Sequence, residues 1–181
     1  MIRSISAHLV ACAITLCVLW MPASATGALL EGHNVEFQWL FPTINTPYAD
    51  ADNGSKLVGP DCEVNGVAGT SGSIDISDTN ILIDFNAYGT LTSEAFNGFR
   101  ITDINGTIPG FTGVTINPAT TLSGVNNIHV AFDSDNVWVD LAGLYFTDDT
   151  IVSLDISAVP EPTSLSLLAL GGLALLRRRR A

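Results

Sequence analysis

The sequence predicts an all-β protein whose residues 26–158 form a single antiparallel β-sandwich or jelly-roll-like domain. Three observations support this fold class. No stretch of this region repeats apolar residues at the helical spacing of three and four for the length of a helix. Apolar residues instead alternate with polar ones in short segments, as in strands with one buried face. Four Asn-Gly pairs lie among these segments, and both residues tolerate the positive φ of tight turns.

Five segments show the alternation most clearly, and we expect each to be one of about eight to ten strands. They are residues 35–41, 81–85, 128–132, 137–141 and 152–156. The expected buried faces are Val35, Phe37, Trp39 and Phe41; Ile81, Ile83 and Phe85; Ile128, Val130 and Phe132; Val137, Val139 and Leu141; and Val152, Leu154 and Ile156. The last three strands are expected to pair in order as a meander, with residues 133–136 as its first loop and with Asp140 and Asp155 facing outward. Turns are expected at the Asn-Gly pairs 53–54, 65–66, 97–98 and 105–106.

Charge is distributed unevenly along the chain. Residues 26–158 hold 17 of the 18 carboxylates but only two cations, Lys56 and Arg100, so this region has a net charge of −15. A nucleic-acid binder must neutralise phosphates with a basic face, and an anionic membrane surface also attracts basic segments. The composition therefore excludes nucleic acid as a partner and argues against binding of anionic lipid by this region.

Residues 1–25 are predicted to be a secretory signal peptide. Arg3 supplies the positive start, residues 9–20 are apolar apart from Thr15, and Ala23 and Ala25 offer signal peptidase the small side chains of a cleavage site. The alternative is a transmembrane helix, but the apolar run is shorter than the roughly 20 residues that span a bilayer. The exported chain is then expected to keep one cysteine, Cys62, which we interpret as a partly buried apolar residue rather than a bridge or a nucleophile.

The C-terminal residues 159–181 have three parts with separate physical roles. Pro160 and Pro162 bracket Glu161 and keep that segment extended, so that a processing enzyme can reach it. Residues 165–176 are apolar apart from Ser166 and can enter lipid, although a helix over residues 163–176 is about 21 Å long against a bilayer core of about 30 Å. The final cluster, expected to stay on the cytoplasmic side, is Arg177, Arg178, Arg179 and Arg180. A short helix of this kind favours a transient membrane anchor over a permanent one.

This order of Pro-Glu-Pro, short apolar helix and arginine cluster resembles the PEP-CTERM sorting signal of exported bacterial proteins. The resemblance is confined to residues 159–181, and an ordinary tail anchor is the alternative. It implies that exosortase, a membrane cysteine transpeptidase, recognises Pro160, Glu161 and Pro162 and removes the helix. The protein would then be transiently anchored in the inner membrane before reaching the cell envelope, the surface or the extracellular matrix.

Catalytic motifs are scarce in the region between the two terminal signals. It has two histidines, His33 and His129, and contains neither a Gly-x-Ser-x-Gly nucleophile elbow nor a His-Glu-x-x-His metal motif. Paired carboxylates for glycoside hydrolysis leave no spacing signature, so that class stays open. We do not expect an enzyme, and a secreted glycan-acting enzyme is the third of our functional hypotheses.

Acidic loops make calcium the one cofactor worth considering. Asp50, Asp52 and Asp61 occupy positions 1, 3 and 12 of an EF-type loop. Ser55 stands where that loop needs its glycine, and position 12 is Asp rather than Glu, so an EF-hand is excluded. An acidic turn that holds calcium in a β-domain remains possible. The alternative is turn chemistry, in which Asp and Asn side chains cap local backbone groups.

Aromatic side chains on an outer face would suggest stacking against sugars. Trp39 lies on an apolar face and is expected in the core, whereas Trp138 alternates with Val137 and Val139 and is expected to face outward. The first functional hypothesis is an exported, surface-associated or matrix protein with a structural or adhesive role. The second is a carbohydrate-binding module that contacts extracellular polysaccharide through Trp138 and has calcium-stabilised acidic loops.

Overall fold

The structure is a computed structural model that describes residues 29–67, 72–124 and 129–158. The elements of these ranges are strands, and every strand pairing is antiparallel, so the prediction of an all-β antiparallel domain is confirmed. Within these ranges no helix is long and apolar enough to cross a membrane. The expected signal peptide and the C-terminal residues 159–181 lie outside the described residues.

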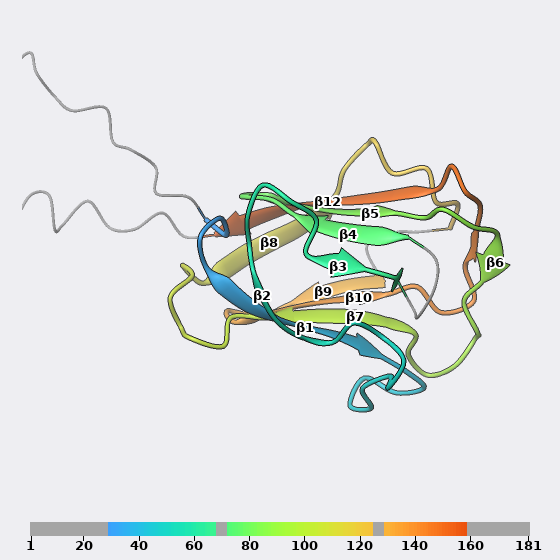
Figure 1. Ribbon diagram of the computed structural model, residues 1–181, viewed down its shortest axis with the longest axis horizontal. Helices are drawn as coiled ribbons and strands as arrows, with labels where there is room; N and C mark the ends of the chain where they lie inside the picture. The colour runs from blue at the N-terminus through green and yellow to red at the C-terminus, as the bar shows by residue number, and fades with distance from the viewer. Residues whose placement is uncertain (1–28, 68–71, 125–128, 159–181) are drawn as a thin grey trace, which may run out of the picture.

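Two five-stranded sheets face each other as layers (Figure 1). The first has the order β2 (Gly54–Leu57), β1 (Asn34–Leu40), β7 (Gly98–Thr102), β10 (Asn136–Asp140) and β9 (Val130–Phe132). The second has the order β3 (Val64–Asn65), β4 (Ser73–Ile76), β5 (Asn80–Asp84), β12 (Ile151–Ala158) and β8 (Phe111–Ile116). A two-stranded ribbon pairs β6 (Gly89–Thr90) with β11 (Tyr145–Phe146). Several of these strands have only two residues, which is why the sequence predicts fewer strands.

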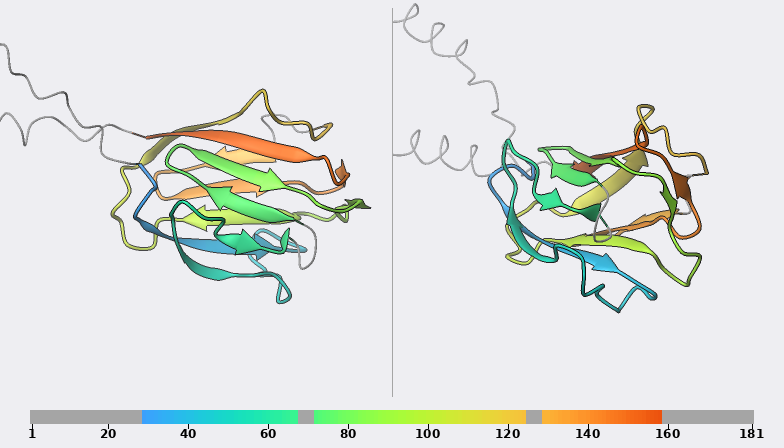
Figure 2. Two further views of the ribbon diagram at one scale, coloured as in Figure 1. Left: turned by 45° about the horizontal axis from the view of Figure 1, so that its top comes forward. Right: turned by 45° about the vertical axis from the view of Figure 1, so that its right-hand side comes forward.

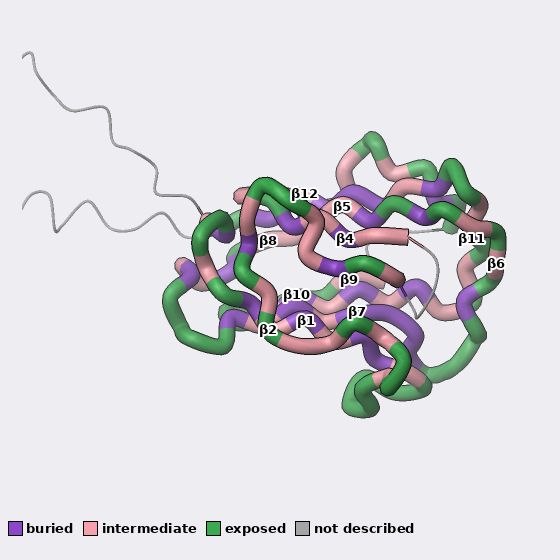
Figure 3. The backbone as a smooth tube through the Cα atoms, viewed as in Figure 1, coloured by how far each residue is buried: buried purple, intermediate pink, exposed green. Residues whose placement is uncertain are grey.

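One hydrophobic core fills the space between the two sheets. The alternation predicted for β1, β5, β10 and β12 is confirmed, because Val35 and Phe37, Ile81 and Ile83, Val137 and Val139, and Val152 and Leu154 are all at most 1% exposed. Figure 3 shows the result as buried stretches along the inner strands and exposed stretches in the loops. Burial of these side chains supplies the main driving force for folding.

The described chain begins and ends at the same end of the domain. Asp78 accepts hydrogen bonds from the backbone N–H groups of Leu29 and Leu30, and the neighbouring Thr79 carbonyl accepts one from Ile156 at 2.8 Å, near the end of β12. Strand β12 points toward this end in Figure 1, and the β6–β11 ribbon lies at the opposite end. Both views in Figure 2 show the same separation. We call the end that carries the ribbon the ribbon end.

Two expected strand faces differ from the structure. Strand β1 ends at Leu40, so Phe41 lies half-buried beyond it, and Leu40, expected on the polar face, is 1% exposed because the chain folds back to form a bridge between Leu40 and Pro47. Val130 is half-buried and packs against the core, whereas Phe132 is 42% exposed, so the buried face predicted for this strand is wrong at Phe132. Strand β9 lies at the edge of its sheet, where the core no longer covers both residues. Ile128 lies outside the described residues.

The predicted meander is correct for its first pair only. Strands β9 and β10 form a hairpin, with Phe132 opposite Val137. Strand β12 lies in the other sheet, between β5 and β8. A period of two tells which face of a strand is buried, but two facing sheets bury the same kind of face. The ribbon strand β11 lies between β10 and β12 in the chain, where the chain passes from one sheet to the other.

The Asn-Gly pair at residues 97–98 was predicted to form a turn, and this prediction is wrong. Gly98 is the first residue of β7 and pairs with Leu40 on one side and Asp140 on the other. A Cβ atom at Gly98 would lie 1.9 Å from the carbonyl oxygen of Val139. The glycine is needed there because two backbones approach closely. The turn predicted at residues 53–54 is also wrong, since Gly54 is the first residue of β2 and pairs with Phe37. Gly66 and Gly106, by contrast, lie outside the strands and have positive φ, as the predicted turns require.

Candidate functional site

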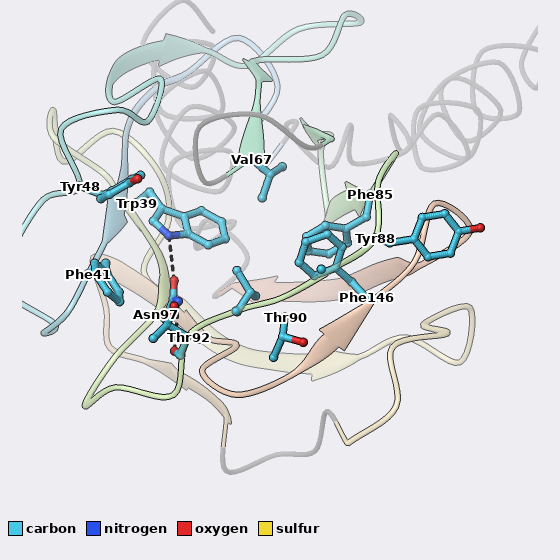
Figure 4. Close-up of a pocket in the computed structure, with 12 residues that line it drawn as sticks. Trp39, Phe41, Tyr48, Val67, Phe85, Tyr88, Thr90, Thr92, Asn97 and Phe146 are labelled. Atoms are coloured by element: carbon cyan, nitrogen blue, oxygen red, sulfur yellow. Dashed lines mark hydrogen bonds between the residues drawn. The ribbon is translucent and has the colours of Figure 1, made fainter.

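A cavity of about 330 Å³ opens at the ribbon end of the domain. Its walls come from the end of β1, the turn after β5, the ribbon and the segment before β7. Figure 4 shows aromatic rings on two sides of it, and they are Trp39, Phe41 and Tyr48 on one side and Phe85, Tyr88 and Phe146 on the other. Elements distant in the sequence therefore build one aromatic site.

The rings of the cavity pack against each other in pairs. Phe85 and Phe146 are stacked with their centroids 4.4 Å apart, and Phe41 meets Tyr48 edge to face at 5.9 Å. Gly89 makes the first pair possible, because a Cβ atom there would lie 2.6 Å from Cζ of Phe146. Such pairs contribute about 0.5–1.5 kcal/mol beyond their buried area and hold the walls in place.

A buried amide forms the polar part of the cavity wall. Asn97, 5% exposed, accepts a hydrogen bond at Oδ1 from Nε1 of Trp39 at 3.2 Å and donates one from Nδ2 to the carbonyl of Thr92, also at 3.2 Å (Figure 4). Its backbone N–H donates to Oδ1 of Asp140 at 3.1 Å. These contacts fix the amide and orient the indole.

Uncharged and hydroxyl-bearing residues surround the opening of the cavity. Thr90 and Thr92 are exposed, and Tyr48 is half-buried. Tyr88 is 67% exposed, and Figure 4 shows its ring directed away from the other rings. A hydrogen bond from its hydroxyl to the Asp148 carboxylate, together with the negative charge of that carboxylate, raises the pKa of Tyr88 above its ordinary value of 10.0. None of the described residues that line the cavity is charged.

Trp138 lies on the outer face of the first sheet and is half-buried there. In the register of the sheet it stands between Arg100 on β7 and Ala131 on β9, and Arg100 in turn stands opposite Gln38 on β1. Nη2 of Arg100 donates to Oε1 of Gln38, and the buried Nε of Arg100 has no hydrogen-bond partner in the described structure. The result is a row of polar and aromatic side chains across three strands.

The predicted calcium ligands are not brought together. Asp50 and Asp52 precede β2, Asp61 follows it, and Asp52 forms an ion pair of 2.7 Å with Lys56. In the ranges that the structure describes, no group of three His, Cys, Asp or Glu side chains could hold a metal ion. Asn53 anchors the first loop instead, since its side chain accepts from Trp39 N–H and donates to the Tyr48 carbonyl, both at 2.7 Å.

The acidic loop at residues 133–136 closes the β9–β10 hairpin, as predicted. Oδ1 of Asp133 accepts from the backbone N–H groups of Asp135 and Asn136, both at 2.8 Å. The hydrogen bond from the Asp135 backbone, with those from Asn136, lowers the pKa of Asp133 below its ordinary value of 3.8. Turn chemistry therefore accounts for this carboxylate.

The remaining candidates from the sequence lie apart from one another. Nδ1 of His33 and Oγ1 of Thr107 form a hydrogen bond of 2.9 Å in an exposed position, and His129 is half-buried beside β9. Cys62 is half-buried, as expected, and its thiol donates to the carbonyls of Val64 and Ile74. Neither histidine is part of the cavity wall.

These features define an acidic, all-β antiparallel domain whose last strand ends where the C-terminal tail begins. Residues 158–180 match the PEP-CTERM protein-sorting motif. The predicted resemblance of residues 159–181 to the PEP-CTERM sorting signal is thereby confirmed. The roles of Pro160, Glu161 and Pro162 and of the arginines at 177–180 within it stay predictions, and these residues lie outside the described ones. The motif implies export, processing by exosortase and a location in the cell envelope or at the surface. No curated protein and no solved structure matches the chain.

The sequence did not predict this cavity. Trp39 was expected in the core and is indeed 1% exposed, but its indole also lines the cavity. The sequence signal for it was a concentration of aromatic residues at the ends of two expected strands, at Phe41 and Phe85, and shortly after them, at Tyr48 and Tyr88. Periodicity could not show that these two strand ends meet.

Proposed function

We propose that this chain is an exported, non-catalytic protein that serves a structural or adhesive role in the cell envelope or in extracellular matrix. The observation that carries the proposal is the sorting motif that begins at residue 158, in the last residue of β12. The folded domain, which we classify as a β-sandwich, is then the cargo of the signal. Its high negative charge favours solubility after release.

Processing of the tail is the first test of the proposal. In a host that has exosortase, the exported protein should lack residues 165–181 in intact-mass spectrometry, because the enzyme would cut near Pro160–Pro162. Replacing Glu161 by Ala should leave the tail in place and the protein in the membrane fraction. Replacing Glu94 by Ala, an exposed carboxylate of the domain, is the matched control and should not change processing. Recovery of an intact C-terminus outside the cell would contradict the proposal.

The structural or adhesive role needs a separate measurement. A strain without this protein should shed more surface polymer under shear than the parent strain, and the processed protein should co-purify with that polymer. Turnover of a polysaccharide by the purified protein would instead support the third hypothesis, a secreted glycan-acting enzyme.

A second candidate function is carbohydrate binding on the outer face of the first sheet. The row of Gln38, Arg100 and Trp138 supports it. An indole can stack on the apolar face of a sugar ring, and neighbouring polar side chains can form hydrogen bonds with its hydroxyl groups. Loss of glycan-array binding in a Trp138→Ala variant would favour this function. Unchanged binding in that variant would exclude this face as the site.

A further inference from the structure

The cavity at the ribbon end has chemistry that neither the sorting signal nor the outer face explains. We propose that it binds a single sugar ring of a neutral polysaccharide. This inference goes beyond the proposed function, because it assigns a ligand class and a site to a domain for which export alone requires neither.

The aromatic rings of the cavity would contact the apolar face of the sugar ring. A pyranose ring presents apolar C–H groups on its faces, and aromatic side chains such as Tyr48 and Phe41 can pack against them. The edge-to-face contact between these two rings holds them in a fixed position, 5.9 Å apart. Fixed walls reduce the entropy that the protein loses when a ligand binds.

The side chain of Asn97 would form hydrogen bonds with a hydroxyl group of the sugar. Its carboxamide has two N–H donors and two acceptor lone pairs, and the structure uses one donor, to Thr92, and one lone pair, for Trp39. The second donor and the second lone pair have no partner in the described structure, although the residue is only 5% exposed. A sugar hydroxyl can accept and donate at once and so can use both. A hydrocarbon ligand would leave them unpaired, which is costly in a buried site.

The charges of the molecule favour a neutral ligand. No Lys, Arg or His is among the described residues of the cavity wall, and residues 26–158 carry a net charge of −15. A uronic acid or a sulfated sugar would be repelled by this field and would find no cation to pair with. A cationic amino sugar would be attracted by this field but would find no carboxylate among the described wall residues to pair with.

The size and position of the cavity fit one ring of a longer chain. Its volume of about 330 Å³ lies near the lower limit of small-molecule sites, which span about 300–1,000 Å³. Strand β12 runs its eight residues, about 25 Å, between the ribbon end and the end where the sorting motif begins. The cavity therefore opens at the end of the domain remote from the tail, where a polymer can reach it before and after processing.

The test uses the full chain in a detergent whose headgroup is not a sugar. The probes are neutral glucans, mannan, galactan and xylan, with alginate and polygalacturonate as acidic probes, on a glycan array and then in titrations. Thr92→Trp places a ring at the opening of the cavity, and Tyr48→Ala removes one wall. Each should weaken binding of the best neutral glycan at least tenfold, while the acidic probes should not bind.

Two control variants distinguish binding in the cavity from binding on the outer face of the first sheet and from a general effect of an added indole. Thr115→Trp makes the same substitution on exposed β8, and Trp138→Ala removes the outer indole; both should keep the affinity within twofold. Circular dichroism and melting curves identify a variant that fails to fold, and Thr90→Trp then replaces it as the blocking variant.

Three outcomes would overturn the inference: preference for acidic glycans, binding that Thr92→Trp and Thr90→Trp leave intact, or absence of neutral-glycan binding. A protein that is exported and processed but binds no neutral glycan would overturn it alone and leave the proposed function standing.

Discussion

The indole Nε1 of Trp39 and the side-chain Oδ1 of Asn97 form a buried hydrogen bond of 3.2 Å between residues that are 58 positions apart. Trp39 is near the end of β1, and Asn97 comes directly before β7, its neighbour in the first sheet. The contact joins the hydrophobic core to the wall of the cavity. Its contribution to stability can be measured directly.

Replacing Asn97 by Ala should lower the free energy of unfolding by about 1–3 kcal/mol, because the buried indole N–H and the Thr92 carbonyl lose their partner. Urea unfolding of the full chain, followed by tryptophan fluorescence, measures this loss. Asn45→Ala is the control, since Asn45 is exposed and its effect should stay within about 0.5 kcal/mol. Equal stability of the two variants would refute the role given to Asn97.

Replacing Gly98 by Ala should be strongly destabilising, by about 3 kcal/mol or more, because the new Cβ would lie 1.9 Å from the Val139 carbonyl oxygen and the backbone cannot move away cheaply. Gly113→Ala is a matched substitution in strand β8, where the nearest side-chain atom is Cβ of Ser157 at 3.7 Å. Thermal melting should show a large decrease for the first variant and little change for the second. A wild-type melting temperature for Gly98→Ala would show that β7 and β10 are not this close.

The Asp133 carboxylate should make the domain more stable at neutral than at acid pH. Hydrogen bonds from Asp135 and Asn136 lower its folded pKa, so its contribution is complete above the unfolded value of 3.8 and is lost as the pH falls through the lower folded pKa. The difference in unfolding free energy between the wild type and Asp133→Asn should therefore be largest near pH 6 and shrink toward pH 2. Asp135→Asn, which removes the same charge from an exposed side chain of the same loop, is the matched control. A difference that grows on acidification would contradict this assignment.

Calcium binding by the acidic loops stays a prediction, and the structure sharpens its test. Calcium should raise the melting temperature of the full chain above that in a monovalent salt of matched ionic strength. Asp50→Asn should reduce that increment, while Asp61→Asn should leave it unchanged, because Asp61 lies beyond the other end of β2. Identical melting curves in calcium and in chelator would leave only turn chemistry for these aspartates.

Much of the strand content could be predicted because burial on one face imposes a period of two on the sequence. Strands β1, β5, β10 and β12 were recognised in this way. Strands β3, β6 and β11 were not, since two residues are too few to show any period. Strand β9 shows the opposite error, because its apolar pattern predicts a buried Phe132, which is 42% exposed at the edge of its sheet.

The candidate sites differ in how well they could be predicted from the sequence alone. The sorting signal could be predicted because its three parts are contiguous in the sequence and follow one another in a fixed order. The proposed calcium ligands lie on either side of β2 and form no three-residue metal group in the part of the chain that the structure describes, and spacing along the chain could not show this separation. The cavity could not be predicted from the sequence, since its aromatic rings come from four separate segments of the chain.

The sequence alone determined the class of fold, the acidic character of the domain and the identity of the sorting tail, because all three depend on composition, local periodicity or contiguous motifs. Tertiary structure decided which sheet each strand joins, why Gly98 must be a glycine and where Trp39, Asn97, Phe85 and Phe146 meet. These features depend on contacts between residues far apart in the chain. A pattern of alternating residues specifies which side of a strand is buried, but not the strand that will lie beside it.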